Sequence, residues 1–367
     1  MHGFAALQQQ AADRFLREPI DLEVRDNPAQ CVSQRQVAAS VSQADRTGDE
    51  ECSLVRAGAG APPDPLNGRP GRQGVPIQVV QNNLGHASIV ESLLNYAHDV
   101  RQGRPGAPPL RVVSYDVRLG LAIPSFPARF PLVVGSGGPG ALDPRENDGV
   151  SASSQGILEN PAWEAPLFRF FDGVFASPST AMLGICHSFG VLARWAGVAR
   201  AALRGPERGG KSAGIVTNIL TDDAWAHPFF GDYFAENGSP DVKVLDSRLF
   251  DLLPTGTGIA RPLGFDSDGS GPGPAVTMFE FARMEDGTLP RIWGVNHHPE
   301  IGDTLLQRER LERVWANGGV SRDWYEERLG ALAAWHVSAA TEQGLQRTTR
   351  WTFEKPLRLH LERALAG

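Results

Sequence analysis

The stretch AMLGICHSFGVLARW, residues 181–195, determines the fold class because it joins a short apolar strand to a helix through a sharp turn. Residues 181–186 are apolar over the length of a buried strand, and residues 187–203 repeat apolar side chains at helical spacing. The side chains expected on the inward face of this helix are Val191, Leu192, Trp195, Val198 and Ala202. A strand that leads directly into a helix is half of a βαβ unit, so the segment predicts a parallel sheet.

The same alternation of strands and helices continues on both sides of this segment. Upstream strands are predicted from the apolar runs PIQVV (76–80), RVVSYDV (111–117) and FPLVV (130–134). Upstream helices are predicted at 161–175 and around the stripe Ile89, Val90, Leu93, Leu94 and Ala97. Downstream, AVTMFEFAR (275–283) and RIWGVNHH (291–298) flank an Asp-Gly turn and predict a hairpin. The pattern predicts an α/β fold with a doubly wound, mainly parallel sheet.

The chain divides into three predicted parts. Residues 1–75 are predicted to be a poorly ordered or surface-draped N-terminal extension with one short helix near 4–16, because they are polar and end in a Pro/Gly stretch. Residues 76–302 hold the α/β domain. Residues 303–367 are predicted to be a helical C-terminal extension that either covers the sheet or forms a docking surface. This extension carries half of the tryptophans, Trp315, Trp324, Trp335 and Trp351.

Composition excludes several classes of function. The net charge of −7 has no long run of one sign, which argues against nucleic acid or an anionic membrane as the main partner. We expect a cytoplasmic protein, because no apolar stretch is long enough to span a bilayer and the N-terminus lacks the pattern of a secretory signal. Three cysteines cannot form a complete set of disulfides, and their spacing matches no zinc site. Cys31 and Cys52 are interpreted as incidental thiols, and no cofactor is expected.

Cys186 lies where the predicted strand turns into the helix, between Gly184 and Gly190. Such a turn lifts a nucleophilic side chain clear of the sheet, and small neighbours let the strand and the helix approach closely. The helix N-terminus also presents free N–H groups and a partial positive charge, which favour the thiolate. A buried structural cysteine at a strand end is the alternative. We interpret Cys186 as a candidate nucleophile.

A glycine-rich loop, VGSGGPG at 134–140, follows another predicted strand. Glycines leave backbone N–H groups uncovered, and such groups can stabilise the oxyanion of a tetrahedral intermediate. A phosphate cradle is the competing function, but no Lys-Ser/Thr follows and the spacing matches no dinucleotide fingerprint. A plain turn is the structural alternative.

His298 and Glu300 lie two residues apart with Pro299 between them, directly after a predicted strand. A thiol nucleophile needs a base within hydrogen-bond reach, and the base needs a partner that fixes its tautomer. One loop can supply both groups here. A metal site made of His297, His298 and Glu300 is the alternative, although adjacent histidines in a strand point to opposite faces.

Together the motifs SGGPG, GIC and GVNHHPE resemble, in content and order, those of the class I glutamine amidotransferase family, over roughly residues 76–302. The resemblance implies a flavodoxin-like sheet in which Cys186 is the nucleophile, His298 the base and Glu300 the group that orients it. It also implies an oxyanion- and substrate-binding region at Gly137, Gly138, His187 and Ser188, with N–H groups of Gly138 and His187 as the oxyanion donors.

The sequence departs from the family next to the nucleophile. Ser188 and Gly190 stand where the family usually has glycine and a substrate-holding glutamine. With His187 directly after Cys186, the sequence Ile-Cys-His at 185–187 resembles the elbow of protease and chaperone-like relatives, which lack the HPE motif. Arg248 stands where a histidine is frequent, whereas Glu280 matches a common strand glutamate. No synthetase, ATP-grasp or pyrophosphatase motif accompanies the domain.

Three functions follow from these residues. The first is hydrolysis of the glutamine side-chain amide through a γ-glutamyl thioester at Cys186, with ammonia released to a separate synthetase subunit. The second is hydrolysis of a γ-glutamyl or other amide by the same three residues, which Ser188 and Gly190 motivate. The third is a catalytically silent binding or regulatory module. The intact set of Cys186, His298 and Glu300 argues against the third.

Overall fold

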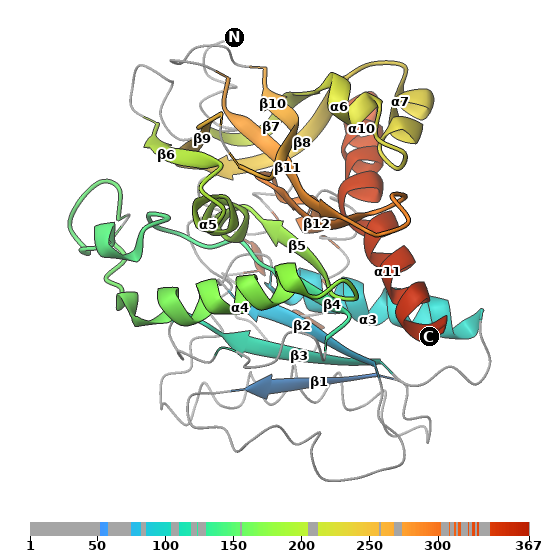
Figure 1. The fold of residues 1–367 in the computed structure, drawn as a ribbon, viewed down its shortest axis with the longest axis horizontal. Coiled ribbons are helices and arrows are strands. Elements are labelled where there is room, and N and C mark those ends of the chain that lie inside the picture. The colour runs from blue at the N-terminus through green and yellow to red at the C-terminus, as the bar shows by residue number, and fades with distance from the viewer. Residues whose placement is uncertain are drawn as a thin grey trace.

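The computed structural model describes residues 52–57, 75–81, 86–103, 110–118, 130–154, 156–204, 212–256, 258–267, 274–301 and 338–366, with a few isolated positions besides. They form a ten-stranded sheet, a separate two-stranded sheet and flanking helices (Figure 1). No helix in these ranges is long and apolar enough to cross a membrane. The predicted helix near 4–16 and Cys31 lie outside the described residues.

Parallel strands form the centre of the large sheet, in the spatial order β3-β2-β4-β5-β12. Their bounds are β2 (Val75–Gln81), β3 (Leu110–Asp116), β4 (Leu132–Gly135), β5 (Ala181–Ile185) and β12 (Pro290–Val295). In chain order this is the 2-1-3-4-5 arrangement of flavodoxin-like proteins, so the predicted fold class is confirmed. A further strand, β1 (Cys52–Ala57), lies parallel to β3 within the segment for which the sequence predicts an extension.

Antiparallel strands extend the sheet beyond β12. They are β11 (Val276–Arg283), β10 (Arg261–Asp266), β7 (Ser212–Leu220) and β8 (Asp241–Arg248). The predicted hairpin is confirmed, because β11 and β12 pair antiparallel around the Asp-Gly turn. The short helices α6 (Asp222–Trp225) and α7 (Gly231–Asn237) lie between β7 and β8 in the chain.

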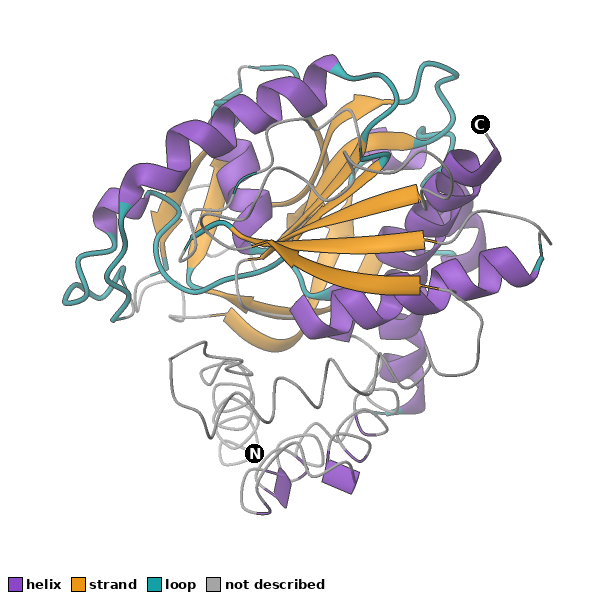
Figure 2. Cartoon of the chain, turned by 90° about the horizontal axis from the view of Figure 1, so that it is seen from below, coloured by secondary structure: helices purple, strands orange, loops and turns teal. Residues whose placement is uncertain are grey.

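Helices cover both faces of the sheet, which makes it doubly wound (Figure 2). One face packs against α3 (His86–Gln102), α10 (Ala339–Thr349), the π-helical segment η8 (Arg350–Glu354) and α11 (Lys355–Ala366). The other packs against α4 (Glu164–Ala176) and α5 (His187–Trp195). The apolar stripe of α3 explains its docking, because Ile89, Leu93 and Ala97 are fully buried.

The helix after Cys186 is shorter than the sequence predicts. Helix α5 ends at Trp195, and residues 199–203 form strand β6 (Ala199–Leu203), which pairs with β9 (Phe250–Pro254). Gly197 adopts φ 67°, and the N–H of Val198 donates to the carbonyl of Ala193. This is the hydrogen-bond pattern of a Schellman C-cap, which stops a helix even where apolar residues continue beyond it.

The helical prediction for the C-terminal segment is confirmed at 339–366. Trp351 is buried against the sheet among Phe229 and Tyr233, with ring centroids 5.3 and 6.3 Å away. Most of the chain between Gly302 and Val337 lies outside the described residues. The division of the chain at residues 75 and 302 stays a prediction.

Candidate functional site

Three neighbouring parallel strands, β4, β5 and β12, end at the same edge of the sheet and bring the three predicted motifs together. Gly135 of β4 is in register with Gly184 of β5, and Val295 of β12 is in register with Ile185. The glycine-rich loop, Cys186 and the loop that carries His298 therefore begin side by side. Open α/β sheets bind ligands at this carboxyl edge.

Cys186 has a strained backbone. Its φ of 49° and ψ of −106° make it the only non-glycine residue with positive φ in the described ranges. Its N–H donates to Val295 O at 2.8 Å, and its carbonyl accepts from Gly190 N at 3.0 Å. Such conformations persist only where the surroundings enforce them, and they gather at functional sites. The turn predicted at Cys186 is therefore a strained strand-to-helix elbow.

Glycine at position 184 lets the elbow close. A Cβ atom there would lie 3.1 Å from both the backbone nitrogen and the Cα of Phe189 in α5. Because these are backbone atoms, they have little freedom to move aside. The close approach of β5 and α5 therefore depends on a residue without a side chain.

His298 and Glu300 form a buried pair. The Nδ1 atom of His298 lies 2.9 Å from Oε1 of Glu300, and the backbone N–H of His298 donates to Leu245 O at 2.8 Å. Burial disfavours the charged imidazolium, but the adjacent Cys186 and Glu300 outweigh it and raise the pKa of His298 well above its usual value. The structure thus brings Cys186, His298 and Glu300 together.

The thiol of Cys186 has an acceptor that the sequence did not reveal. Its Sγ atom lies 3.8 Å from the backbone carbonyl of Ser247, near the end of β8. Strand β8 also supplies the carbonyl of Leu245 that holds His298. The end of β8 therefore contacts both Cys186 and His298, a relation that only the tertiary structure reveals.

The side chains that follow Cys186 hold the glycine-rich loop. The hydroxyl of Ser188 donates to Ser136 O at 2.6 Å, and Nε2 of His187 lies 3.2 Å from Ala141 O. Burial, reinforced by the charge of Arg118, holds the pKa of His187 well below its usual range, so its neutral ring donates through Nε2. Both side chains therefore face the loop, whereas oxyanion binding by the N–H groups of Gly138 and His187 stays a prediction.

A second set of residues fixes the outer part of this loop. Arg118 forms a buried ion pair with Glu159 and donates to Pro139 O at 2.9 Å. Asn147 donates to Glu159 Oε2 at 2.6 Å, and its Oδ1 accepts from Ala141 N at 2.7 Å. The loop is thus preorganised by groups that have no local sequence signal.

Charged residues surround the end of β8. Arg248, the position of a frequent family histidine, is buried and lies with its Nε 3.1 Å from Asp251 Oδ1. Asp251 also pairs with Arg204 at 2.9 Å, and Arg248 pairs with Asp266. Arg248 therefore serves a buried ionic cluster beside Ser247.

Glu280 belongs to a different buried group. Burial opposes its charge, but hydrogen bonds from His227 at 2.8 Å and Arg283 at 2.7 Å lower the pKa of Glu280 to about 2. His227 lies in the segment AHPFF at 226–230, and its Nδ1 accepts from Phe229 N at 2.9 Å. These contacts join β11 to the segment between α6 and α7.

The alternative metal site is not assembled. His297 bonds through Nε2 to Thr352 Oγ1 at 3.2 Å, whereas His298 bonds to Glu300. Within the described ranges, no group of three or more His, Cys, Asp or Glu side chains has the arrangement to hold a metal ion.

Comparisons with known proteins find similar solved structures and nothing else. No protein-family model matches this chain. No curated protein matches it either. A glutamine amidotransferase from Thermotoga maritima is similar at 16% identity and TM-score 0.46, covering 81% of this chain and 100% of that one.

Two further structures are similar at lower scores. A protein described as a putative GMP synthase subunit, from Thermoplasma acidophilum, has 15% identity and TM-score 0.37, with 72% of this chain and 97% of that chain covered. The glutaminase domain of Trypanosoma brucei CTPS with bound acivicin has 10% identity and TM-score 0.38, with 71% and 93% covered. Because all three TM-scores lie below 0.5, the fold assignment rests on strand order and register.

Proposed function

We propose that this protein hydrolyses a side-chain amide of the glutamine type, with Cys186 as nucleophile. One observation carries this function: Cys186 occupies a strained elbow next to the buried His298–Glu300 pair, beside a glycine-rich loop on the neighbouring strand. This arrangement has the nucleophile, base and orienting group that covalent amide hydrolysis requires. The first candidate substrate is glutamine, with ammonia passing to a separate synthetase subunit.

In the first step, the Cys186 thiol gives its proton to Nε2 of His298, and Sγ attacks the carboxamide carbon. Nε2 is the ring nitrogen that remains when Nδ1 binds Glu300, and the Cys186 thiol is a neighbour whose charge and hydrogen bond raise the pKa of His298. The carbonyl oxygen becomes an oxyanion, for which the N–H groups of Gly138 and His187 are the proposed donors.

In the second step, the tetrahedral intermediate collapses, its C–N bond breaks, and His298 returns the proton to the leaving nitrogen. Ammonia leaves, and the acyl group stays on Cys186 as a thioester. His298 then removes a proton from water, which attacks the thioester, so that the acid forms and the thiol is regenerated. Glu300 keeps Nδ1 protonated throughout, which fixes the ring in the orientation that both proton transfers need.

A γ-glutamyl amide other than glutamine is the second candidate substrate, and Gly190 favours it. The family's substrate-holding glutamine would stand at this position, but a Cβ atom there would lie 2.5 Å from Leu142 Cδ1. No side chain fits at 190 unless Leu142 moves. The contact that the family makes from this position must therefore be replaced or absent.

Ammonia release separates the candidates. The purified full-length protein would be incubated in parallel with glutamine and with a series of γ-glutamyl amides, and the released ammonia or amine would be quantified. The proposal predicts turnover of at least one of them and loss of that turnover in Cys186→Ala. Turnover of γ-glutamyl amides without glutamine turnover favours the second substrate. Turnover that persists in Cys186→Ala contradicts both.

The partner is tested separately. Affinity capture with the wild-type protein, followed by an ammonia-release assay on the captured complex, tests whether a synthetase binds and raises the rate. The proposed transfer of ammonia predicts that glutamine supports amination by the complex in the absence of added ammonium. An unchanged rate with no bound synthetase contradicts the transfer but leaves the hydrolase chemistry in place.

A further inference from the structure

Hydrogen bonds join the C-terminal helices to the start and middle of strand β12 and to the loop that follows it. His360 Nε2 lies 2.8 Å from Pro290 O at the start of the strand, and Trp293 Nε1 donates to Thr352 O at 3.1 Å in the middle. Beyond its end, His297 Nε2 lies 3.2 Å from Thr352 Oγ1. Thr352 therefore holds both the strand and the residue that precedes His298.

A local feature of the helix makes Thr352 available for this contact. In an α-helix its carbonyl would accept from the N–H four residues later, but that residue is Pro356, which has no N–H. The chain adopts π-helical geometry over Arg350–Glu354, and the carbonyl of Thr352 accepts from Trp293 instead. π-Helical turns are rare and occur frequently at functional sites.

The hydrogen bond between His297 and Thr352 has a defined direction. The Thr352 hydroxyl donates its one proton to Thr348 O at 2.8 Å, so it accepts from Nε2–H of His297. Burial, together with the neighbouring His298, lowers the pKa of His297 to about 3, so the ring is neutral at physiological pH. The tautomer of His297 is therefore fixed with its proton on Nε2.

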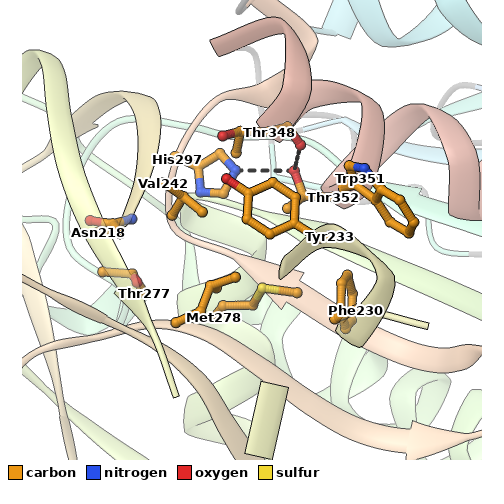
Figure 3. A pocket seen from close by; sticks show the side chains of 11 residues that line it. Asn218, Phe230, Tyr233, Val242, Thr277, Met278, His297, Thr348, Trp351 and Thr352 are labelled. Atoms are coloured by element: carbon orange, nitrogen blue, oxygen red, sulfur yellow. Dashed lines mark hydrogen bonds between the residues drawn. The ribbon is translucent and has the colours of Figure 1, made fainter. Parts of the chain in front are cut away.

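The other nitrogen of His297 lies at a small buried cavity (Figure 3). Nδ1 of His297 and Oδ1 of Asn218 are both buried without a partner in the described residues, and both side chains line this cavity of about 20 Å³. That volume suits a water molecule, which could donate to both atoms. Among the described residues, Thr352 is the only protein group in hydrogen-bond contact with the ring of His297.

A second contact reaches the other side of His298. The hydroxyl of Thr349 donates to Pro299 O at 3.0 Å. Pro299 separates His298 from Glu300, so the C-terminal segment contacts the residue on each side of the proposed base, the ring of His297 and the carbonyl of Pro299. Small displacements at a reacting group are costly, because an error of about 1 Å can slow a reaction by about 10²-fold.

We propose that Thr352 is a positioning residue for His298, acting through its hydrogen bond to His297, so that the C-terminal segment completes the active site. This inference rests on the proposed role of His298 as the base. It predicts that removal of one buried hydroxyl, remote from the substrate, changes the chemistry at Cys186.

The test compares the full-length wild type with Thr352→Val, Thr352→Ser and Phe353→Leu. Valine keeps the shape of threonine and removes the hydroxyl, whereas serine restores it. Phe353 is buried in the same π-helical segment but packs on Tyr96 of α3, with ring centroids 6.2 Å apart. Phe353→Leu therefore controls for general loosening of this segment.

The readout is the rate at which iodoacetamide alkylates Cys186, followed on its own peptide by mass spectrometry across a range of pH. Thr352→Val is expected to move the midpoint of this profile to higher pH and to lower kcat about tenfold with little change in KM. Thr352→Ser should restore most of the wild-type midpoint and of the wild-type kcat. Phe353→Leu should lower the melting temperature without moving the alkylation profile. An unchanged profile in Thr352→Val, or the same shift in Phe353→Leu, overturns the inference.

The two proposals fail in different ways. A shifted alkylation profile in Thr352→Val, in a protein that hydrolyses neither glutamine nor γ-glutamyl amides, contradicts the proposed function and supports the positioning role. Wild-type turnover with an identical alkylation profile and kcat in Thr352→Val contradicts the positioning role and leaves the proposed function standing.

Discussion

The loop after β12 carries two adjacent histidines, His297 and His298, whose pKa values are shifted in opposite directions. His298 faces Cys186 and Glu300, and these groups raise its pKa. His297, the residue before it, faces Thr352 and the small cavity that Asn218 also lines, and burial lowers its pKa to about 3. Environment therefore distinguishes the two histidines: in the proposed function His298 transfers protons, whereas His297 supports the loop.

The largest expected difference is between the effects of substituting His298 and His297 on kcat/KM. His298→Asn should lower kcat/KM by more than about 10³-fold, because the thiol loses its base. His297→Asn should lower it by no more than about tenfold, because only support for the loop is weakened. Steady-state kinetics on the substrate that the wild type turns over measure both. Equal losses in the two variants would remove the distinction between the two histidines.

Glu300→Gln should have the next largest effect. Glutamine keeps the shape of the side chain but removes the charge that stabilises the imidazolium and fixes its tautomer, so kcat should fall by about 10³-fold. KM should change little, because Glu300 is buried behind His298. A variant that retains wild-type kcat would show that the hydrogen bond between Nδ1 and Oε1 does not orient the base.

Two histidines with lowered pKa values, His297 and His360, should make stability depend on pH. His360 on the same face as His297 is buried, and burial lowers its pKa to about 4. In the unfolded chain each histidine binds a proton near pH 6.5, whereas in the folded chain it does so only near its lowered pKa. The stability from each histidine is therefore fully present above pH 6.5 and is lost as the pH falls from 6.5 toward that lowered pKa. The unfolding free energy should fall by about 1.4 kcal/mol per pH unit for each group in that window.

Denaturant titrations between pH 4 and 7 measure this slope, and His360→Gln is the control. Glutamine can still donate to Pro290 O but does not titrate. The slope of the unfolding free energy against pH should therefore decrease by the contribution of one histidine, about 1.4 kcal/mol per pH unit. For His298 the sign is reversed, because its raised pKa gives stability that is present at low pH and is lost as pH rises. A slope that His360→Gln leaves unchanged contradicts the assignment.

A smaller effect, on the free energy of unfolding, is expected from a substitution in the elbow that carries Cys186. Gly184→Ala places a Cβ atom 3.1 Å from the backbone of Phe189, so the unfolding free energy should fall by about 1–3 kcal/mol. Gly103 is the control, because among the described residues a Cβ atom there meets only Val100 O at 3.6 Å and Asp99 O at 4.0 Å. Gly103→Ala should therefore change stability by less than about 0.5 kcal/mol. Equal losses would show that the elbow tolerates a side chain.

Local patterns explain what the sequence predicted. Consecutive residues determine the strand at 181–186, the hairpin at 275–298 and the motifs at the strand ends. Because these motifs follow strands of one parallel sheet, their place at its carboxyl edge could be foreseen. The end of helix α5 was missed because apolar residues continue past Gly197, and only the backbone conformation of that glycine stops the helix.

Contacts between distant parts of the chain could not be foreseen. Arg118 and Glu159 lie 41 residues apart, His297 and Thr352 lie 55 apart, and Cys186 and Ser247 lie 61 apart. No single-sequence pattern links such pairs, because burial and side-chain direction in the folded sheet decide them. These contacts hold the glycine-rich loop, His298 and Cys186, so the sequence predicted the candidate site residues but not the contacts that position them.

Formation of a covalent intermediate between Cys186 and an amide substrate is the step on which the proposed function depends. Rapid-quench peptide mass spectrometry of the wild type, during turnover of glutamine or a γ-glutamyl amide, detects this intermediate without any further assumption. We predict an acyl adduct on the peptide that contains Cys186, formed and lost at rates compatible with turnover and absent in Cys186→Ala. Steady turnover with no adduct on that peptide, undiminished in Cys186→Ala, would contradict covalent catalysis by this thiol.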